Sequence, residues 1–195
     1  MPDQPHTLCR PEKARKPLTA CFETAEVIVS AVLAIAILFS FVLRFAGVVG
    51  ASMEPTLSNR DWLAITSYMH EPERGRIVII SPRTNQFSEP LVKRVIGLPG
   101  DEVDIRDGFV FINGHVITEP YLNRELRTER ASEQLSTMIE YPLTVPPNMV
   151  FVLGDNRGGS KDSRHDAIGL VRIDDILGRV MFRLWPNPQA NFTGR

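Results

Sequence analysis

Apolar residues follow two patterns along the chain, and these patterns predict one long helix followed by a β domain. From residue 27 to 43, seventeen consecutive residues carry no charge, and Ser30 and Ser40 are the only polar ones. A helix of this length measures about 25 Å, close to the lower limit for crossing the hydrocarbon core of a bilayer. We therefore predict a transmembrane helix over residues 25–45, after a tail over residues 1–24.

Two other interpretations of this apolar run stay open. A buried core helix usually has a polar stripe, which the run lacks, and a cleavable signal peptide usually begins with a shorter charged segment. The tail over 1–24 holds four basic and three acidic residues. Basic residues flank the cytoplasmic end of membrane helices, whereas acidic residues contribute little to orientation. We therefore expect the N-terminus in the cytoplasm and residues 46–195 outside it.

The rest of the chain has the short apolar segments and turn pairs of a β domain. Two turn dipeptides, Asp-Gly at 107–108 and Asn-Gly at 113–114, favour tight hairpins. The polar stretch 123–140 is expected to be an exposed loop. We predict a mainly β, antiparallel domain with a small β-hairpin cap at about 100–150, tethered by the transmembrane helix. The predicted strands are 62–67, 76–80, 102–106, 109–112, 115–118, 149–153 and 176–184.

The composition removes several classes of protein. With Lys+Arg 22 and Asp+Glu 23, the net charge is −1, so no basic excess predicts a nucleic-acid partner. Two cysteines are too few for a disulfide framework or a cysteine-rich zinc site. The acidic and amide residues at 154–164 do not have the spacing of an EF-hand calcium loop, so we predict no metal site.

Ser52 and Lys93 belong to the first two of three polar clusters that could carry chemistry. Ser52 lies between small residues and a proline turn, where it is either an exposed nucleophile or a cap or turn residue. Lys93 and Arg94 point to opposite faces of a predicted strand, so burial of one face would place one of them in apolar surroundings. Burial can lower a lysine pKa by up to about 3–5 units, which makes the amine a usable base near neutral pH. Alternatively, both side chains lie in water on an edge strand.

The third cluster, residues 154–164, is rich in Gly, Asp, Asn, Ser and Arg. By itself it indicates a polar turn held together by Asp–Arg pairs and by bonds from side chains to the backbone. A calcium loop is the other interpretation, and the spacing disfavours it.

Taken in order, the three clusters resemble the motifs of the bacterial type I signal peptidases. Ser-Met-Glu-Pro-Thr-Leu begins at Ser52, Lys-Arg-Val-Ile-Gly-Leu-Pro-Gly-Asp at Lys93, and Gly-Asp-Asn-Arg-x-x-Ser-x-Asp-Ser-Arg at Gly154. The resemblance extends from the apolar run to about Trp185. It implies an antiparallel β catalytic domain and a membrane-bound serine endopeptidase that cleaves signal peptides from exported preproteins with a Ser/Lys dyad. It also implies small residues one and three positions before the cut, and work at membrane lipid near the secretion translocon.

The resemblance further implies a role for each matching residue. Ser52 corresponds to the nucleophile, its backbone N–H to an oxyanion donor, Lys93 to the general base, and Met53 to a residue lining the substrate cleft. Some relatives add a hydroxyl as oxyanion donor two residues before the nucleophile, but this chain has Gly50 there, so the second donor stays unassigned. Such a mechanism calls for no metal and no organic cofactor. The supporting residues are Ser160, which would orient the lysine amine by a hydrogen bond, and Asp162 with Arg164, which would brace the active-site loops.

The proposed base has physical requirements of its own. Lys93 can accept a proton only while neutral, which requires a dry setting without an adjacent carboxylate. We expect Arg94, on the opposite face of the strand, to keep its charge out of the site.

Other functions stay open. A histidine-based mechanism could use His165, although Lys93 occupies the place that histidine takes in the reticulum-type relatives. Self-cleaving repressors use a Ser–Lys dyad on a similar β fold, but they are soluble. A specialised peptidase of a conjugation system and a catalytically inactive, membrane-anchored binding domain are the remaining alternatives.

Overall fold

The computed structural model describes residues 17–41, 43–67, 71–82, 89–122, 128, 139–189 and 192, without the side chains of 17–20, 38–41 and 43. The chain divides into two compact units, Met1–Ser40 and Phe41–Arg195.

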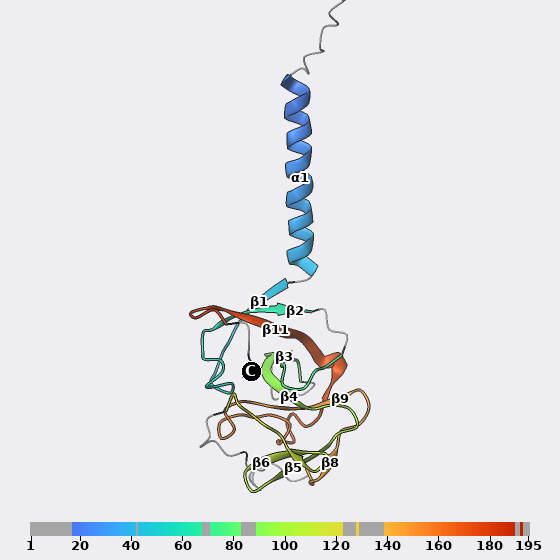
Figure 1. The fold of residues 1–195 in the computed structure, drawn as a ribbon, viewed down its shortest axis with the longest axis vertical. Helices are drawn as coiled ribbons and strands as arrows, with labels where there is room; N and C mark the ends of the chain where they lie inside the picture. Colours follow the sequence, from blue (N-terminus) through green and yellow to red (C-terminus); the bar gives the residue numbers. More distant parts are fainter. Residues whose placement is uncertain are drawn as a thin grey trace, which may run out of the picture. The chain divides into compact units, whose positions relative to one another are not determined.

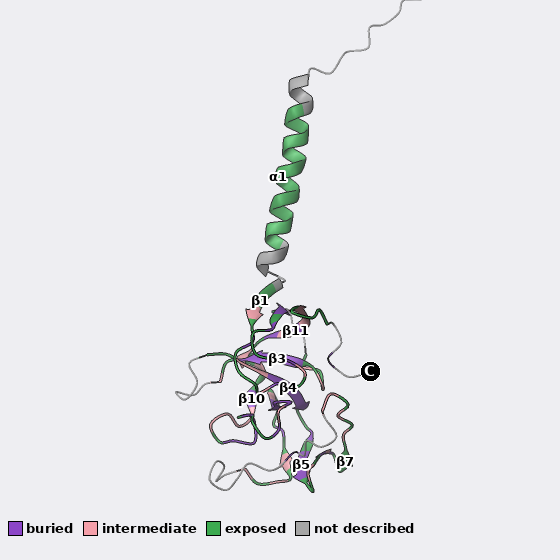
Figure 2. Ribbon diagram, turned by 90° about the vertical axis from the view of Figure 1, so that its left-hand side faces the viewer, coloured by how far each residue is buried: buried purple, intermediate pink, exposed green. Residues whose placement is uncertain are grey.

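The first unit contains helix α1, Pro17–Phe41. Proline is favoured at the first position of a helix, where its missing N–H costs no hydrogen bond. The described apolar side chains of α1 are exposed, as Figure 2 shows. The bounds predicted for this helix, 25–45, are wrong, because α1 begins and ends earlier. It ends earlier because Leu43–Gly47 pairs with another strand. Among the residues that the structure describes, no helix has the length and apolar character needed to traverse a bilayer.

Within the described part of the second unit, seven antiparallel strands form one sheet in the order β1-β2-β11-β3-β4-β9-β10 (Figure 1). This arrangement confirms the predicted mainly β, antiparallel fold. The strands of this sheet are β1 Leu43–Gly47, β2 Trp62–Thr66, β3 Ile77–Ile80, β4 Leu91–Gly97, β9 Met149–Leu153, β10 Val171–Arg172 and β11 Ile176–Trp185. A 3-10 turn, Ile173–Asp175, leads from β10 into β11.

Strand β4 lies inside this sheet, between β3 and β9. Lys93 is opposite Val78 of β3, and Arg94 is opposite both Ile77 of β3 and Leu153 of β9. The alternative of an edge strand in water is therefore wrong. Both faces of β4 are covered: Lys93 is 2% exposed and Arg94 is 0% exposed. The expectation that only one face is buried understated the burial, because both basic residues lie in the interior; Figure 2 colours the ribbon by burial.

A second sheet, of four strands among the described residues, has the order β7-β6-β5-β8. Both predicted hairpins are present, and Asp107, Gly108, Asn113 and Gly114 all have positive φ, as tight primed turns require. In Figures 1 and 2 this sheet lies at the end of the second unit away from β1 and β2. Its bounds are β5 Glu102–Arg106, β6 Phe109–Ile112, β7 His115–Val116 and β8 Leu143–Thr144.

The second sheet falls inside the predicted cap, about 100–150. It belongs to the same compact unit as the large sheet, and Phe151 and Leu153 of β9 pack in one apolar cluster with Val103, Ile105 and Val110. A separate role for this part of the chain stays a prediction. Most of the polar stretch 123–140 lies outside the described residues.

Candidate active site

Ser52 lies in a turn that leads from β1 toward β2. Gly50 has φ +95°, a backbone conformation that favours glycine and lets the chain reverse just before the serine. After Ser52, Met53 and Leu57 are buried, and the N–H of Leu57 donates to Met53 O at 2.9 Å. The two buried residues anchor the turn and leave the Ser52 side chain half-buried at its edge.

The amine of Lys93 reaches the hydroxyl of Ser52 from the middle of β4. Lys93 Nζ donates to Ser52 Oγ at 2.9 Å and to Val92 O at 3.0 Å. Burial lowers the pKa of Lys93 from 10.5 to about 8, while the charges of Asp162 and Asp155 act in the opposite direction. The dry setting expected for this lysine is present. Among the described residues, no carboxylate forms an ion pair with Lys93; Asp162 and Asp155 act on its pKa through their charges, and desolvation outweighs both.

This pKa decides what the pair can do chemically. With a pKa of about 8, roughly one Lys93 side chain in ten is neutral at pH 7, against about one in a few thousand for an exposed lysine. A neutral amine at 2.9 Å from Ser52 Oγ can accept the hydroxyl proton, which makes the oxygen a nucleophile.

Two of the three predicted supporting residues, Asp162 and Arg164, contact each other. The third, Ser160, forms a hydrogen bond with neither Ser52 nor the Lys93 amine. Arg164 Nε donates to Asp162 Oδ1 at 2.8 Å, and Asp162 Oδ2 accepts from Gly154 N–H at 3.0 Å. The Ser160 hydroxyl donates to Lys161 O at 3.4 Å. In the described part of the chain, the predicted hydrogen bond between Ser160 and Lys93 is therefore absent, although Ser160 lies buried against Gly154.

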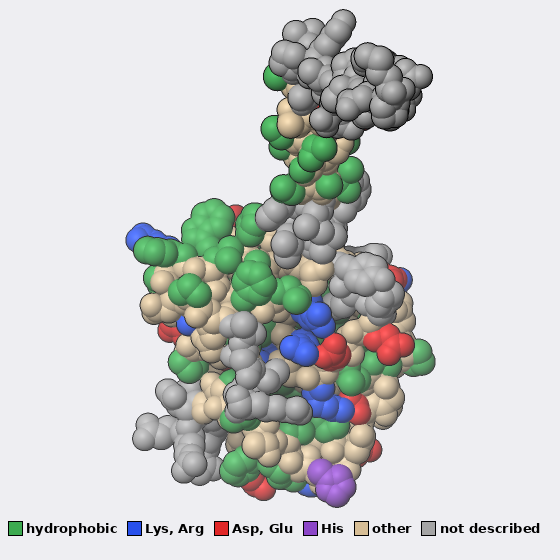
Figure 3. Space-filling view, turned by 45° about the horizontal axis from the view of Figure 1, so that its top comes forward, with side chains coloured by type: hydrophobic (Ala, Val, Ile, Leu, Met, Phe, Trp, Pro, Cys, Tyr) green, Lys and Arg blue, Asp and Glu red, His purple; other side chains and the backbone are tan. Residues whose placement is uncertain are grey.

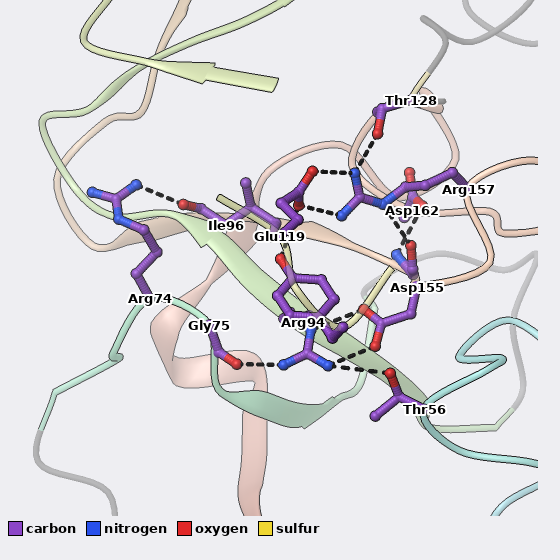
Figure 4. Close-up of polar contacts among 12 residues, drawn as sticks. Thr56, Arg74, Gly75, Arg94, Ile96, Glu119, Thr128, Asp155, Arg157 and Asp162 are labelled. Carbon is purple, nitrogen blue, oxygen red and sulfur yellow. Dashed lines mark hydrogen bonds and ion pairs between the residues drawn. The ribbon is translucent and has the colours of Figure 1, made fainter. Parts of the chain in front are cut away.

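A second buried pair, Arg94 with Asp155, lies beside the site and was not identified from the sequence. Arg94 Nε and NH2 donate to the two carboxylate oxygens of Asp155 at 2.8 and 2.6 Å, and neither side chain is exposed. Arg94 NH1 donates to Gly75 O at 2.6 Å, as Figure 4 shows. The charge of Arg94 is paired with that of Asp155, and the expectation that Arg94 keeps its charge out of the site stays a prediction.

A cleft of about 390 Å³ opens beside Ser52 and is mostly apolar. Met53, predicted to line a substrate cleft, lines this one. Its lining includes Val48 and Val49, which follow β1, and Leu91 and Val92, which begin β4. The whole lining comprises Arg44, Phe45, Ala46, Gly47, Val48, Val49, Ser52, Met53, Ile65, Ile79, Glu89, Pro90, Leu91, Val92 and Leu177.

The backbone N–H of Ser52 has no acceptor among the described residues, so it is available to a ligand oxygen. The N–H of Gly50 donates to Asn59 Oδ1 at 3.2 Å, and the second oxyanion donor stays unassigned. His165 is buried next to Asp162, with its Nδ1 3.9 Å from Asp162 Oδ1. Burial lowers the pKa of His165, and its contacts are with this loop rather than with Ser52.

The fold and the site together define an antiparallel β protein in which a serine hydroxyl faces a buried amine. The family description "Signal peptidase, peptidase S26" matches residues 21–185. The chain is 35% identical over 186 residues to "Probable signal peptidase I-2" of Synechocystis sp., covering 92% of this chain and 80% of that protein. It is 35% identical over 178 residues to "Signal peptidase IB" of Staphylococcus aureus, covering 84% of this chain and 91% of that protein.

A crystal structure of a signal peptidase I from Enterococcus faecalis aligns with a TM-score of 0.45 and 32% identity, covering 57% of this chain and 98% of that one. The chain belongs to the signal peptidase family, peptidase S26. Enzymes named signal peptidase I are serine endopeptidases, and the family is membrane-associated. The chain is therefore a serine endopeptidase of this type, and its substrates are preproteins.

Proposed function

We propose that this protein cleaves N-terminal signal peptides from exported preproteins, with Ser52 as nucleophile and Lys93 as general base. The observation that carries the proposal is the 2.9 Å separation between Lys93 Nζ and Ser52 Oγ, in a lysine that is 2% exposed and has a pKa of about 8. Serine hydroxyls are poor nucleophiles until a neighbouring base takes their proton, and a buried lysine is such a base.

The reaction begins when neutral Lys93 Nζ accepts the proton of Ser52 Oγ as the oxygen attacks the scissile carbonyl. The negative charge that develops on the carbonyl oxygen is stabilised by the N–H of Ser52. The Lys93 ammonium then gives its proton to the leaving amine, which departs as the N-terminus of the mature protein. In the second half of the reaction, Lys93 activates a water molecule that releases the signal peptide from Ser52.

The cleft supports a preference for small side chains one and three positions before the cut. An extended peptide would lie between Val48–Val49 and Leu91–Val92, where backbone groups can pair with it and alternate side chains point toward the walls. Met53 lines the cleft, is 1% exposed and packs in the apolar core, so its side chain has little room to give way to a larger substrate side chain. Bulky side chains are therefore expected to be rejected by steric overlap.

We further propose a single-pass membrane protein with a cytoplasmic N-terminus, an extracytoplasmic catalytic domain over 46–195, and activity near the secretion translocon. The uncharged run at 27–43 and the basic tail support this topology.

Membrane lipid is a further proposed partner. Phe45, Trp62 and Trp185, on the adjacent strands β1, β2 and β11, are more than half exposed, and hydrophobic side chains gather on part of the face in Figure 3.

The test is processing of a purified preprotein by the full chain in detergent micelles. Ser52→Ala should reduce cleavage by about 10⁶-fold, as loss of the nucleophile does in other serine proteases. Ser58→Ala, which changes an exposed serine six residues along the same segment, should process at the normal rate. A preprotein with Phe in place of Ala at the position before the cut should resist the normal enzyme. Unchanged cleavage by Ser52→Ala would contradict the assignment of Ser52 as the nucleophile.

A further inference from the structure

The backbone of Ser52 is held by residues 154–157, here named the serine-holding loop. The N–H of Asn156 donates to Ser52 O at 3.1 Å, and Asn156 Nδ2 donates to Ala51 O at 3.1 Å. Gly154 approaches so closely that a Cβ at this position would overlap Ser52 O. The placement of Ser52 Oγ against Lys93 therefore depends on this loop.

Two buried arginines hold the serine-holding loop in turn. Arg94 donates to both carboxylate oxygens of Asp155, and Arg157 Nε donates to Gly154 O at 3.1 Å. Arg94 is 0% exposed and Arg157 is 2% exposed. A buried guanidinium is costly unless its donors are paired, so the stability of the loop depends on what completes these two cations.

Glu119 and Tyr121 complete both cations. The Tyr121 ring covers the Arg94 guanidinium, whose carbon lies 3.7 Å from the ring centroid. The Tyr121 hydroxyl donates to Glu119 Oε1 at 2.8 Å, and both terminal nitrogens of Arg157 donate to the Glu119 carboxylate. Thr128 Oγ1 also accepts from Arg157, and Figure 4 shows Arg157 between Glu119 and Thr128.

Glu119 and Tyr121 come from the connection between β7 and β8, outside the seven-stranded sheet. Neither residue lines the cleft beside Ser52. We propose that Glu119 and Tyr121 are positioning residues for peptide-bond hydrolysis: they fix the two buried arginines, and through them the loop that keeps Ser52 within reach of Lys93. This inference rests on the proposed function of the site.

The charges around Lys93 make the inference measurable. Among the described groups, the carboxylates of Asp155 and Asp162 raise the Lys93 pKa against the larger effect of burial, and each is paired with an arginine. Loss of the Tyr121 ring would admit water to Arg94 and weaken its pairing with Asp155. Both changes favour the ammonium form of Lys93, so the pKa should rise above about 8.

The experiment compares kcat, KM and the pH dependence of kcat/KM for full-chain variants, with thermal melting as a check of folding. Tyr121→Leu should raise the pH midpoint by about 0.5–1 unit and lower kcat/KM at pH 7 about 3–10-fold. Tyr121→Phe keeps the ring and should keep the midpoint of the unmodified enzyme. Glu119→Gln should lower kcat at least about tenfold with KM within about twofold, because the change acts on the placement of Ser52 and not on binding. Glu102→Gln, an exposed carboxylate of β5, is the matched control and should change nothing.

A folded Tyr121→Leu with an unshifted midpoint, together with a folded Glu119→Gln of normal kcat, would overturn the inference. Lower melting temperatures with normal kcat and midpoint would also overturn it, because they would indicate a purely structural role. If Tyr121→Leu does not fold, the kcat of Glu119→Gln decides. Failure of the proposed function is distinguishable, since it would show as continued processing by Ser52→Ala.

Discussion

Replacement of Arg94 by Met should destabilise the protein strongly. Both hydrogen bonds that the described residues give to the Asp155 carboxylate come from Arg94, at 2.8 and 2.6 Å, and Asp155 is 0% exposed. Arg94→Met would therefore leave a buried carboxylate without a donor. Breaking a buried ion pair in this way costs about 3–5 kcal/mol. For a unit of this size, that loss corresponds to a melting temperature about 6–20 °C lower.

Urea unfolding of the full chain, followed by tryptophan fluorescence, measures this loss. The chain has two tryptophans, Trp62 and Trp185, on adjacent strands of the large sheet, so the signal reports on the unit that contains the ion pair. The matched control is Arg172→Met, which removes the partner of Asp174 in a solvent-exposed pair and should leave the midpoint unchanged.

A double variant separates the lost pair from the lost volume. Arg94→Met/Asp155→Leu removes both charges and should recover most of the stability, because no unpaired carboxylate remains. If Arg94→Met alone cost less than about 1 kcal/mol, or if the double variant were as unstable as the single one, the reasoning from the buried charge would be refuted.

Three further predictions concern the site itself. Lys93→Arg should abolish preprotein cleavage, because a guanidinium does not lose its proton in the working pH range. The urea midpoint of this variant should still be that of a folded protein. Substantial cleavage at pH 7 would contradict this prediction. The kcat/KM of the unmodified enzyme should rise about tenfold per pH unit below pH 8 and level off above it. The reason is that the Lys93 pKa is about 8 and only the neutral amine accepts a proton. A profile that is flat between pH 6 and 8 would be inconsistent with this base. Gly154→Ala should lower kcat at least about tenfold, because a Cβ there would overlap Ser160 Oγ and Ser52 O. The control Gly158→Ala should not lower kcat, because the space around Gly158 is open. Equal rates for the two glycine variants would count against the close packing at Gly154.

The sequence predicted most strands well because their signals are local. The hairpin strands Glu102–Arg106 and Phe109–Ile112 and the strand Met149–Leu153 have the predicted bounds, since turn dipeptides or β-branched runs mark them. The end of the apolar run was misread. Apart from Arg44, Leu43–Gly47 is as apolar as the helix before it, and only its pairing with β2, which the sequence does not reveal, makes it a strand.

The candidate site was predicted in part. The motifs identified Ser52 and Lys93, and the structure brings their side chains together across 41 residues of sequence. The pairing of Arg94 with Asp155 joins residues 61 apart and depends on strand order, so alternation along β4 alone could not predict it. One signal was present, however: an arginine that alternates with apolar residues in an interior strand requires a carboxylate, and the third cluster supplies several.

The neutral amine of Lys93 is tested most directly by NMR titration of the lysine side chains. The chain has only four lysines, at positions 13, 16, 93 and 161, so the Cε signals of ¹³C-labelled full-length protein in micelles can be followed one by one. Lys93→Arg assigns the signal of interest by its disappearance. We expect this signal to titrate with a pKa of about 8, well below the ordinary lysine value of about 10.4. Titration of Lys93 together with the others would contradict a lysine general base at this site.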